Sequence, residues 1–324
     1  MGEFDLIQRY FSEHRRIERS DIELSVGDDC AVVKLEANQR LAITTDTLVV
    51  GNHFLPTISP ADLAYKAIAV NLSDLAAMGA TPKWISLALT LPEIDEAWLA
   101  AFSRSLFDTL NQYQVALIGG DTTKGDLSLT ITAQGVLPVA QGLFRHQAQI
   151  GDLIYVSGTL GDSAAGLAYL LNQQTPTNHA EQFLLQRHLR PTPRVALGKL
   201  LRSYAKCAID ISDGLLADLG HILKSSHCGA TVNVEQLPLS QALLATHTLA
   251  EAERLALTGG ENYELCFTVS PQQQTAMERA VAEIGEVCRC IGRITDAKQG
   301  LSLVKHGKTY PLPSQTGFDH FKQL

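Results

Sequence analysis

The stretch Val70–Pro82, VNLSDLAAMGATP, ends an apolar run that begins near Ala61. Small and aliphatic residues recur in this run at helical spacing, which predicts an amphipathic helix. Gly79 is expected to end the helix in a left-handed conformation, with Pro82 just beyond it. Asp74 lies beside the apolar face, where a carboxylate is costly unless a cation or hydrogen-bond donors meet it. A solvated Asp at the border of the apolar stripe would also fit.

Strands and helices alternate on both sides of this helix. In the first half we expect helices at 4–18 and 96–113 and strands at 30–35, 40–45, 83–91, 115–118 and 127–136. In the second half we expect strands at 153–156, 207–211, 230–234 and 265–269, and helices at 163–172, 213–225 and 272–284, with two more after the polar stretch 173–181. This order predicts an α/β (α+β) fold with mixed strand pairing. The polar segment Gly142–Gly151 suggests two domains, at residues 1–145 and 146–324.

Composition excludes several classes of protein. The 324 residues carry a net charge of −8, which argues against nucleic acid or an anionic membrane as a partner. No apolar run reaches the roughly 18 residues that a membrane span needs, and the N-terminal sequence has no secretory pattern. The six cysteines are scattered, so we expect reduced thiols in a cytoplasmic protein.

Acidic residues follow apolar segments in one repeated design. Each follows or adjoins a small or hydroxylated residue, at Asp28-Asp29, Asp46, Asp74, Asp121, Asp210 and Asp213, and Glu261 has the same setting. Each alone could be an ordinary turn or capping residue. Together they could not all stay ionised without cations, because two charges 4 Å apart repel by about 4 kcal/mol at an effective dielectric of 20. Hard oxygen ligands favour Mg²⁺, so we infer a site with several Mg²⁺ ions that handles phosphate.

The motifs of other catalytic and nucleotide-binding sites match this sequence less well. The loop Gly158–Ser163 has no P-loop lysine, and it could be either an anion site at a helix start or a tight turn. We find no dinucleotide-binding, nucleophile-elbow or zinc-protease motif. His53 follows the strand of Asp46, and a solvated loop histidine would also explain it.

Six ordered motifs resemble one family. They are GDDCA at 27–31, TTDTLVVGNHF at 44–54, NLSDLAAMGATP at 71–82, IGGDTT at 118–123, AIDISDGL at 208–215 and TGGENYEL at 258–265. They are similar to the thiamine-monophosphate kinase family, within the aminoimidazole-ribonucleotide synthetase (PurM-like) superfamily, and the likeness covers essentially the whole chain. Asn262 departs from the pattern, because the family usually has Asp there, which weakens a metal or substrate role for this position.

The resemblance implies a two-domain PurM-like fold whose N-terminal mixed sheets pair into a barrel in a homodimer. It implies ATP-dependent phosphorylation of thiamine monophosphate to thiamine diphosphate with Mg²⁺. Carried over by motif, the expected metal ligands are Asp29, Thr44, Thr45, Asp46, Asp74, Asp121, Asp210 and Asp213. The expected nucleotide contacts are Gly120, Asp121, Arg145 and Ser212, and the expected contacts to thiamine phosphate are His53, Glu261 and Phe318.

The acceptor in this reaction is a phosphate that is already ionised, so we expect no catalytic general base and a direct in-line transfer. Alternatives remain open. A selenophosphate synthetase would need a reactive residue in an N-terminal glycine-rich loop, and the hydrogenase-maturation relative ends in a functional cysteine; neither pattern is found here. A metal-dependent phosphohydrolase or a nucleotide-binding regulatory module would also use clustered acids.

Overall fold

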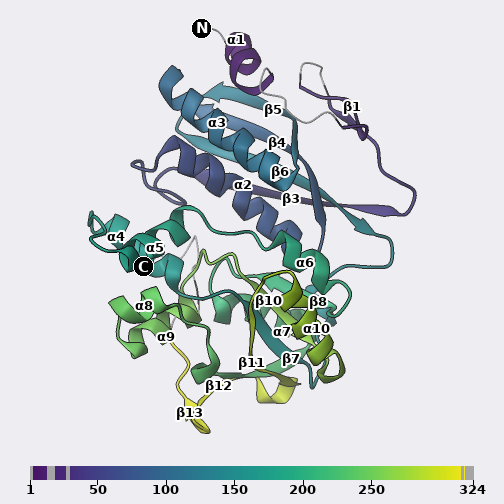
Figure 1. The fold of residues 1–324 in the computed structure, drawn as a ribbon, viewed down its shortest axis with the longest axis vertical. Coiled ribbons are helices and arrows are strands. Elements are labelled where there is room, and N and C mark those ends of the chain that lie inside the picture. The colour runs from purple at the N-terminus through teal and green to yellow at the C-terminus, as the bar shows by residue number, and fades with distance from the viewer. Residues whose placement is uncertain (1–2, 13–18, 27–29, 315–316, 318–324) are drawn as a thin grey trace. The chain divides into compact units, whose positions relative to one another are not determined.

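The structure is a computed structural model that describes residues 3–12, 19–26, 30–314 and 317, with only the backbone of Glu3 and Phe4. It divides into two compact units (Figure 1). Unit 1 comprises residues 1–75 and 80–141, and unit 2 comprises residues 76–79 and 142–324. The change from one unit to the other at Gln141 and Gly142 lies four residues before the predicted boundary, so Arg145 belongs to unit 2.

Unit 1 is built on a four-stranded mixed sheet in the order β3-β6-β4-β5. Its elements are α1 (Glu3–Ile7), a π-helix at Gln8–Ser12, β1 (Ile22–Leu24), β2 (Val32–Val33), β3 (Gln39–Val49), α2 (Pro60–Ala77), β4 (Thr81–Leu91), α3 (Glu96–Tyr113), β5 (Ala116–Lys124) and β6 (Ser128–Pro138). Strands β4 and β5 are parallel, and the other pairs of this sheet are antiparallel. The mixed pairing confirms the predicted fold class for this half of the chain.

The helix of Asp74 forms as predicted. Gly79 has φ of 69° and its N–H donates to the carbonyl of Ala76, while the Ala80 N–H donates to Leu75. This is the left-handed stop expected after the helix, and it suits glycine because a Cβ would strain this backbone. The last two residues of α2, Ala76 and Ala77, belong to unit 2.

Two strand ends were predicted wrongly. We expected strands to stop at Asp46 and just before Asp121, but β3 continues to Val49 and β5 continues to Lys124. Asp46 lies between Thr45 and Thr47, and Thr122 and Thr123 follow Asp121; β-branched residues favour extended backbone, so the strands run on through the motifs. Both acids therefore lie inside their strands instead of at the strand ends.

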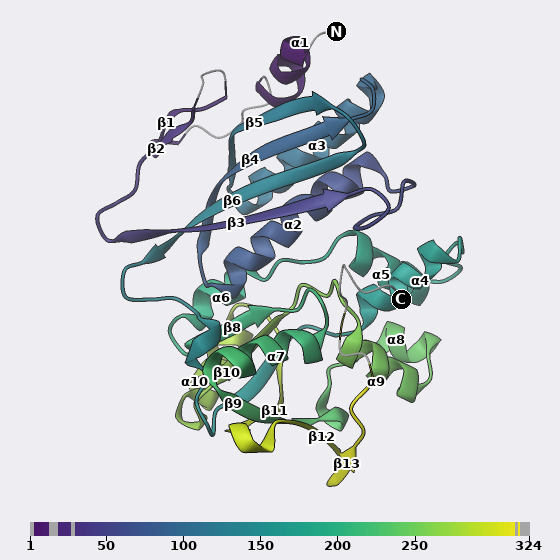
Figure 2. The same ribbon diagram turned by 180° about the vertical axis from the view of Figure 1, so that it is seen from behind.

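The two faces of the four-stranded sheet differ (Figure 2). Helices α2 and α3 cover one face, and the view in Figure 2 is from the other side. Side chains of β3 alternate between the two faces, so Thr44, Asp46 and Leu48 are more buried than Thr45 and Thr47. On the outward side of β3, Leu41 and Ile43 remain exposed, Ile43 by 61%.

Unit 2 contains a seven-stranded sheet in the order β13-β12-β9-β11-β7-β10-β8. Its elements are β7 (Leu153–Ser157), α4 (Asp162–Leu171), α5 (His179–Leu189), α6 (Val195–Leu201), β8 (Cys207–Asp210), α7 (Leu215–Ser226), β9 (Cys228–Asn233), α8 (Gln241–Thr246), α9 (Leu249–Thr258), β10 (Leu265–Val269), α10 (Gln274–Glu283), β11 (Cys288–Asp296), β12 (Leu301–Lys305) and β13 (Lys308–Tyr310), with short 3-10 turns such as Arg145–Gln147. The central strands β7, β8 and β10 are buried along their whole length. This matches the apolar runs that predicted them.

Two helices of unit 2, α8 and α9, were not predicted. Thr248 and Glu251 form a capping box at the start of α9, a signal that the sequence does carry. Asp213 was expected to open a helix, whereas α7 begins at Leu215 with Gly214 before it. All six cysteines are free thiols, and no helix among the described residues is long and apolar enough to cross a membrane.

Candidate functional site

In unit 1 the structure brings three of the predicted metal ligands together. The Thr44 hydroxyl on β3 donates to the Asp74 carboxylate on α2. Asp46 lies two residues along the same face of β3, and burial together with the charge of Asp74 raises the pKa of Asp46 to about 6. Strand alternation and the helix over this face thus bring two carboxylates within electrostatic reach of each other. A pair of this kind is suited to a cation, since the Asp46 carboxylate is destabilised in its ionised form.

Asp121 lies elsewhere on the same sheet. Asp121 on β5 pairs with Ala88 on the neighbouring strand β4. Strands β3 and β5 are the two outer strands of the sheet. Three strand spacings separate β3 from β5, about 14 Å, so Asp121 and Asp46 cannot share one ion. Within unit 1 the structure therefore groups Thr44, Asp46 and Asp74 but not Asp121 with them.

Gly120 and Asp121 border a pocket of unit 1. The pocket is lined by Ile7, Phe11, Val26, Leu87, Leu117, Gly119, Gly120, Asp121 and Thr122. A Cβ at Gly120 would lie 1.9 Å from the carbonyl oxygen of Leu87, so only glycine permits this close approach of β5 to β4. The walls are mostly apolar, with the Asp121 carboxylate as the charged group.

The remaining predicted residues of unit 1 are placed differently. The Thr45 side chain points to the other face of the sheet and shares a 3.0 Å hydrogen bond with Thr132. His53 is partly exposed, and its Nδ1 accepts from the Val49 N–H at 3.1 Å at the end of β3. Asp29 lies outside the described residues.

In unit 2 the motifs AIDISDGL and TGGENYEL lie side by side. The Glu261 N–H donates to Ser212 O at 2.6 Å, and the Tyr263 N–H donates to Ile211 O at 2.9 Å. A Cβ at Gly260 would lie 2.7 Å from Ser212 O, so the glycine is needed for this contact. Asp210 is buried at the end of β8 as predicted, and Ser212 and Asp213 follow it. Ser212 and Asp213 of the first motif thus lie beside Glu261 of the second.

Asp218 is an acid of this region that our sequence analysis missed. Its carboxylate accepts from the N–H groups of Asp213 and Gly214, both at 3.0 Å. Burial and the charge of Asp213 raise the pKa of Asp218 to about 7, while the exposed Arg145 acts in the opposite direction. Position i+4 after Gly214 on α7 was the available signal, because such a carboxylate can cap the start of its own helix.

Of the two substrate contacts predicted in the second half of the chain, only Glu261 is among the described residues. Glu261 has a positive φ of 56°, unusual for a residue with a side chain, and is partly exposed. Phe318 lies outside the described residues, and a Cβ at its neighbour Gly317 would lie 2.8 Å from Asp213 O. Gly317 therefore lies against the AIDISDGL motif.

The side chain of Asn262 is buried and hydrogen-bonded to the backbone of Gly161 and Gly259. It is 2% exposed; its Oδ1 accepts from the Gly161 N–H at 2.9 Å, and its Nδ2 donates to Gly259 O at 2.7 Å. An Asp could keep the first hydrogen bond but not the second, because a carboxylate has no donor. The presence of Asn instead of Asp at position 262 is therefore explained by the hydrogen bond that its amide donates to the backbone.

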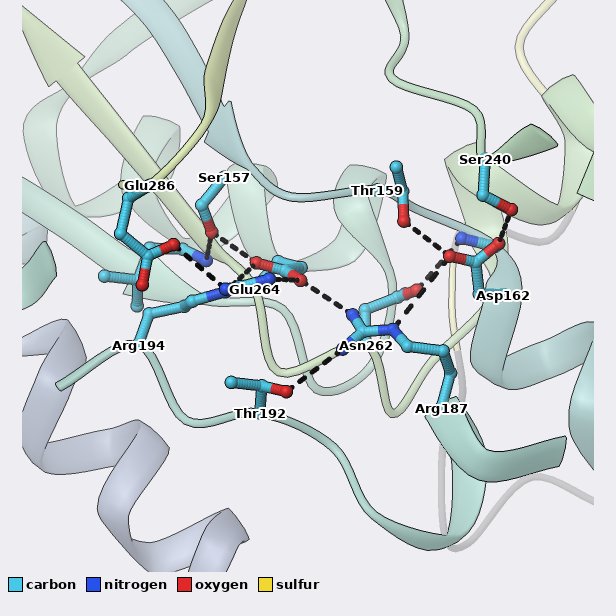
Figure 3. Close-up of polar contacts among 12 residues, drawn as sticks. Ser157, Thr159, Asp162, Arg187, Thr192, Arg194, Ser240, Asn262, Glu264 and Glu286 are labelled. Atoms are coloured by element: carbon cyan, nitrogen blue, oxygen red, sulfur yellow. Dashed lines mark hydrogen bonds and ion pairs between the residues drawn. The ribbon is translucent and has the colours of Figure 1, made fainter. Parts of the chain in front are cut away.

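Glu264 is the second buried acid that we missed, and Figure 3 shows its surroundings. Its side chain is fully buried; Arg194 donates to both carboxylate oxygens at 2.6 and 2.7 Å, and Arg187 donates at 2.7 Å. These guanidinium groups and the Ser157 hydroxyl outweigh burial and hold the pKa of Glu264 below its ordinary value. Arg187 also lies 4.0 Å from Asp162.

The loop Gly158–Ser163 is a tight turn in the structure. The N–H groups of Gly158, Leu160 and Gly161 donate to Val287 O, Pro238 O and Asn262 Oδ1. The Asp162 carboxylate is buried at the same helix start, where it accepts from the hydroxyls of Thr159 and Ser240. Three backbone donors are thus already used, which favours the turn over an anion site.

The donor set in unit 1 fits a hard divalent cation, because it consists of two carboxylates and a hydroxyl. Among the residues that the structure describes, no three His, Cys, Asp or Glu side chains come together as a ready-made metal site. Asp46 and Asp74 thus supply only part of a coordination shell, which water or substrate oxygens would have to complete.

Comparison with known families identifies the chain. The family model for the AIR synthase related protein, N-terminal domain, matches residues 27–137, and the model for the C-terminal domain matches residues 149–304. The thiamine-monophosphate kinase of Haemophilus influenzae is 56% identical over 100% of this chain and 99% of its own length. That of Escherichia coli K12 is 54% identical over 99% of this chain and 98% of its own length.

Solved structures agree with these relatives. The crystal structure of thiamine-monophosphate kinase from Stenotrophomonas maltophilia superposes with a TM-score of 0.87 at 45% identity, covering 96% of this chain and 98% of the other. The structure of AaThiL complexed with AMPPCP and TMP has a TM-score of 0.77 at 32% identity, covering 98% and 96%. The two-domain PurM-like fold is therefore confirmed, and the chain belongs to the thiamine-monophosphate kinases of the AIR synthase related family.

Proposed function

We propose that the protein phosphorylates thiamine monophosphate to thiamine diphosphate with ATP as the phosphate donor. The observation that carries this proposal is identity of 54–56% with thiamine-monophosphate kinases over essentially the whole chain. The related structure of AaThiL holds AMPPCP and TMP together, which fits a reaction between a nucleotide and thiamine monophosphate. The enzyme is thus a kinase whose acceptor is itself a phosphate.

Several Mg²⁺ ions are part of the proposal. In unit 1 Thr44, Asp46 and Asp74 would hold one, since burial and a like charge raise the pKa of Asp46 to about 6 and a cation would relieve both effects. The other proposed ligands are Asp29, Thr45, Asp121, Asp210 and Asp213. Bound Mg²⁺ supplies charge neutralisation between the two phosphate-bearing substrates. Oxygen-only donors support Mg²⁺ over softer metals.

Nucleotide and substrate contacts are proposed by motif. Gly120 and Asp121 border the mostly apolar pocket of unit 1, whose walls suit a flat base, and Arg145 and Ser212 are the proposed contacts in unit 2. For thiamine monophosphate we propose His53, Glu261 and Phe318. The negative charge of Glu261 and the aromatic ring of Phe318 both suit a thiazolium cation.

Transfer is proposed to be direct and in line, without a general base or a phosphoenzyme. The attacking phosphate oxygen is ionised at neutral pH, so no side chain has to remove a proton. The residues of this chain then have two tasks, to place two anions next to each other and to offset their repulsion.

We also propose two domains, at residues 1–145 and 146–324.

We further propose a homodimer formed through the open face of the four-stranded sheet. Leu41, Ile43 and Val49 lie exposed along β3, an edge strand, and such an apolar stripe favours burial against a second copy. Replacing Ile43 by Lys should shift light-scattering mass from dimer to monomer. The free thiols are consistent with the cytoplasm, which we propose as the location.

Incubation of the purified protein with thiamine monophosphate, Mg²⁺ and γ-labelled ATP tests the function. We expect labelled thiamine diphosphate, and no label on the protein after acid quench. Release of inorganic phosphate from thiamine monophosphate without ATP would favour a phosphohydrolase. ATP binding without turnover would favour a regulatory module, and a labelled protein would refute direct transfer.

A further inference from the structure

His188 lies where it can control the carboxylate of Glu261. It is on α5 and 4% exposed, and its Nδ1 lies 3.3 Å from Glu261 Oε2 and 3.1 Å from Ser163 Oγ. Neither His188 nor Ser163 belongs to the motifs that identified the family. We propose that His188 is a positioning residue, which holds the Glu261 carboxylate in the orientation that binds the cationic part of the substrate.

The position of His188 is set by close packing of α4 against α5. A Cβ at Gly166 would lie 2.1 Å from Leu184 O and 3.1 Å from His188 Cβ, so the helices meet at backbone distance there. Ser163, one turn earlier on α4, is 2% exposed, and its Oγ lies 3.1 Å from the same imidazole nitrogen. Because the imidazole is enclosed on these sides, it has little freedom to leave Glu261.

Glu261 is held from its backbone as well. Glu261 and Tyr263 have φ of 56° and 52°, and their N–H groups donate to Ser212 O and Ile211 O. Asn262 between them is tied to Gly161 and Gly259. Residues with sparsely populated backbone conformations persist where the surrounding structure enforces them, and such residues are often found at functional sites. The backbone supports thus fix the Glu261 Cα, and His188 fixes the end of the side chain.

The neighbouring Glu264 shows why this pair is not simply structural. Glu264 is fully buried and its charge is matched by two guanidinium groups. The Glu261 side chain is 28% exposed, and the His188 Nδ1 lies 3.3 Å from its Oε2. Part of the Glu261 side chain therefore remains accessible to a cation such as thiazolium.

Steady-state kinetics on the full-length protein test the inference, which rests on the proposed function. In His188→Leu we expect KM for thiamine monophosphate to rise about tenfold, with kcat and KM for ATP within about twofold, since an interaction equal in ground and transition states changes KM alone. His188→Asn places an amide near the Nδ1 position, so its KM should stay within about threefold of wild type. Gln182→Ala, exposed on the same helix, is the matched control.

A double-mutant cycle separates positioning from general damage. In the Glu261→Gln background, His188→Leu should raise KM for thiamine monophosphate no further, because its partner is already altered. An unchanged KM in His188→Leu, or a full tenfold rise in the Glu261→Gln background, would overturn the inference. If leucine at 188 prevents folding, His188→Asn and His188→Gln decide, since only Asn reaches with a polar atom near Nδ1; equal KM values would contradict it. An inactive wild type would instead refute the proposed function.

Discussion

The buried acids of the two units differ in how their charge is balanced. In unit 1, burial and Asp74 both raise the pKa of Asp46, and no basic side chain among the described residues contributes to that shift. In unit 2, Arg187 and Arg194 surround Glu264 and lower its pKa despite complete burial. A balanced acid is a structural element, whereas an unbalanced pair costs stability and suits a ligand that brings positive charge. The comparison predicts that mutations should affect activity at one site and stability at the other.

The largest effect is expected from Asp74→Asn. The amide oxygen can still accept from Thr44, but the charge needed to hold Mg²⁺ is lost, so kcat should fall at least about 10³-fold. The melting temperature should stay the same or rise, because a like charge beside Asp46 is removed. Turnover assays and thermal unfolding of the same preparation measure both. Near wild-type turnover in this variant, or in Asp121→Asn, would count heavily against these roles.

Glu264→Gln should show the reverse pattern. The substitution removes the buried charge to which both Arg187 and Arg194 donate, and breaking a buried ion pair in this way costs roughly 3–5 kcal/mol. We expect a melting temperature lower by at least about 6 °C, with residual kcat near wild type in the fraction that is folded. Glu96→Gln is the control, since its ion pair with Arg9 is more than half exposed and is worth about 0–1 kcal/mol. Equal losses in both variants would remove the distinction between the units.

The pH dependence of stability without metal should have opposite signs at the two acids. The folded-state pKa of Asp46 is about 6, against 3.8 ordinarily, so the folded protein binds its proton more tightly. Stability should therefore fall by up to about 3 kcal/mol as pH rises from about 4 to 6, and Asp46→Asn should remove this slope.

Glu264 has a lowered pKa, so its contribution is present above its ordinary 4.5 and is lost as pH falls below that value. Urea unfolding in EDTA across pH 3–7 measures both trends. A slope between pH 4 and 6 that persists in Asp46→Asn would show that another group is responsible.

The smallest effect is expected from Mg²⁺ itself. A ligand at ten times its Kd stabilises the folded state by about 1.4 kcal/mol, so Mg²⁺ should raise the melting temperature by a few degrees. Asp46→Asn should lose this rise, while Glu264→Gln should keep it relative to its own lower baseline. Thermal scans with Mg²⁺ and with EDTA make the comparison, and a rise preserved in Asp46→Asn would argue against a metal in unit 1.

Most of the fold was accessible from the sequence because it depends on local patterns. The apolar period of α2, the left-handed Gly79 and the exact span of α3 at Glu96–Tyr113 follow from helical spacing and end signals. Errors arose where two local signals compete. Glycine and aspartate at 119–121 indicated a turn, but the parallel pairing of β5 with β4 carried the strand through them.

The candidate site was predicted as a list of acids and hydroxyl groups, without knowledge of which would meet. Sequence order and motif spacing determined the family, the fold class and the residue types that handle phosphate. Only the tertiary structure decided that Thr44 and Asp46 share a face with Asp74 while Thr45 does not, and that Glu264 is buried between two arginines while Glu261 is partly exposed beside His188. Strand register and helix packing join residues far apart in the chain, and charge balance depends on those neighbours instead of on the residue itself.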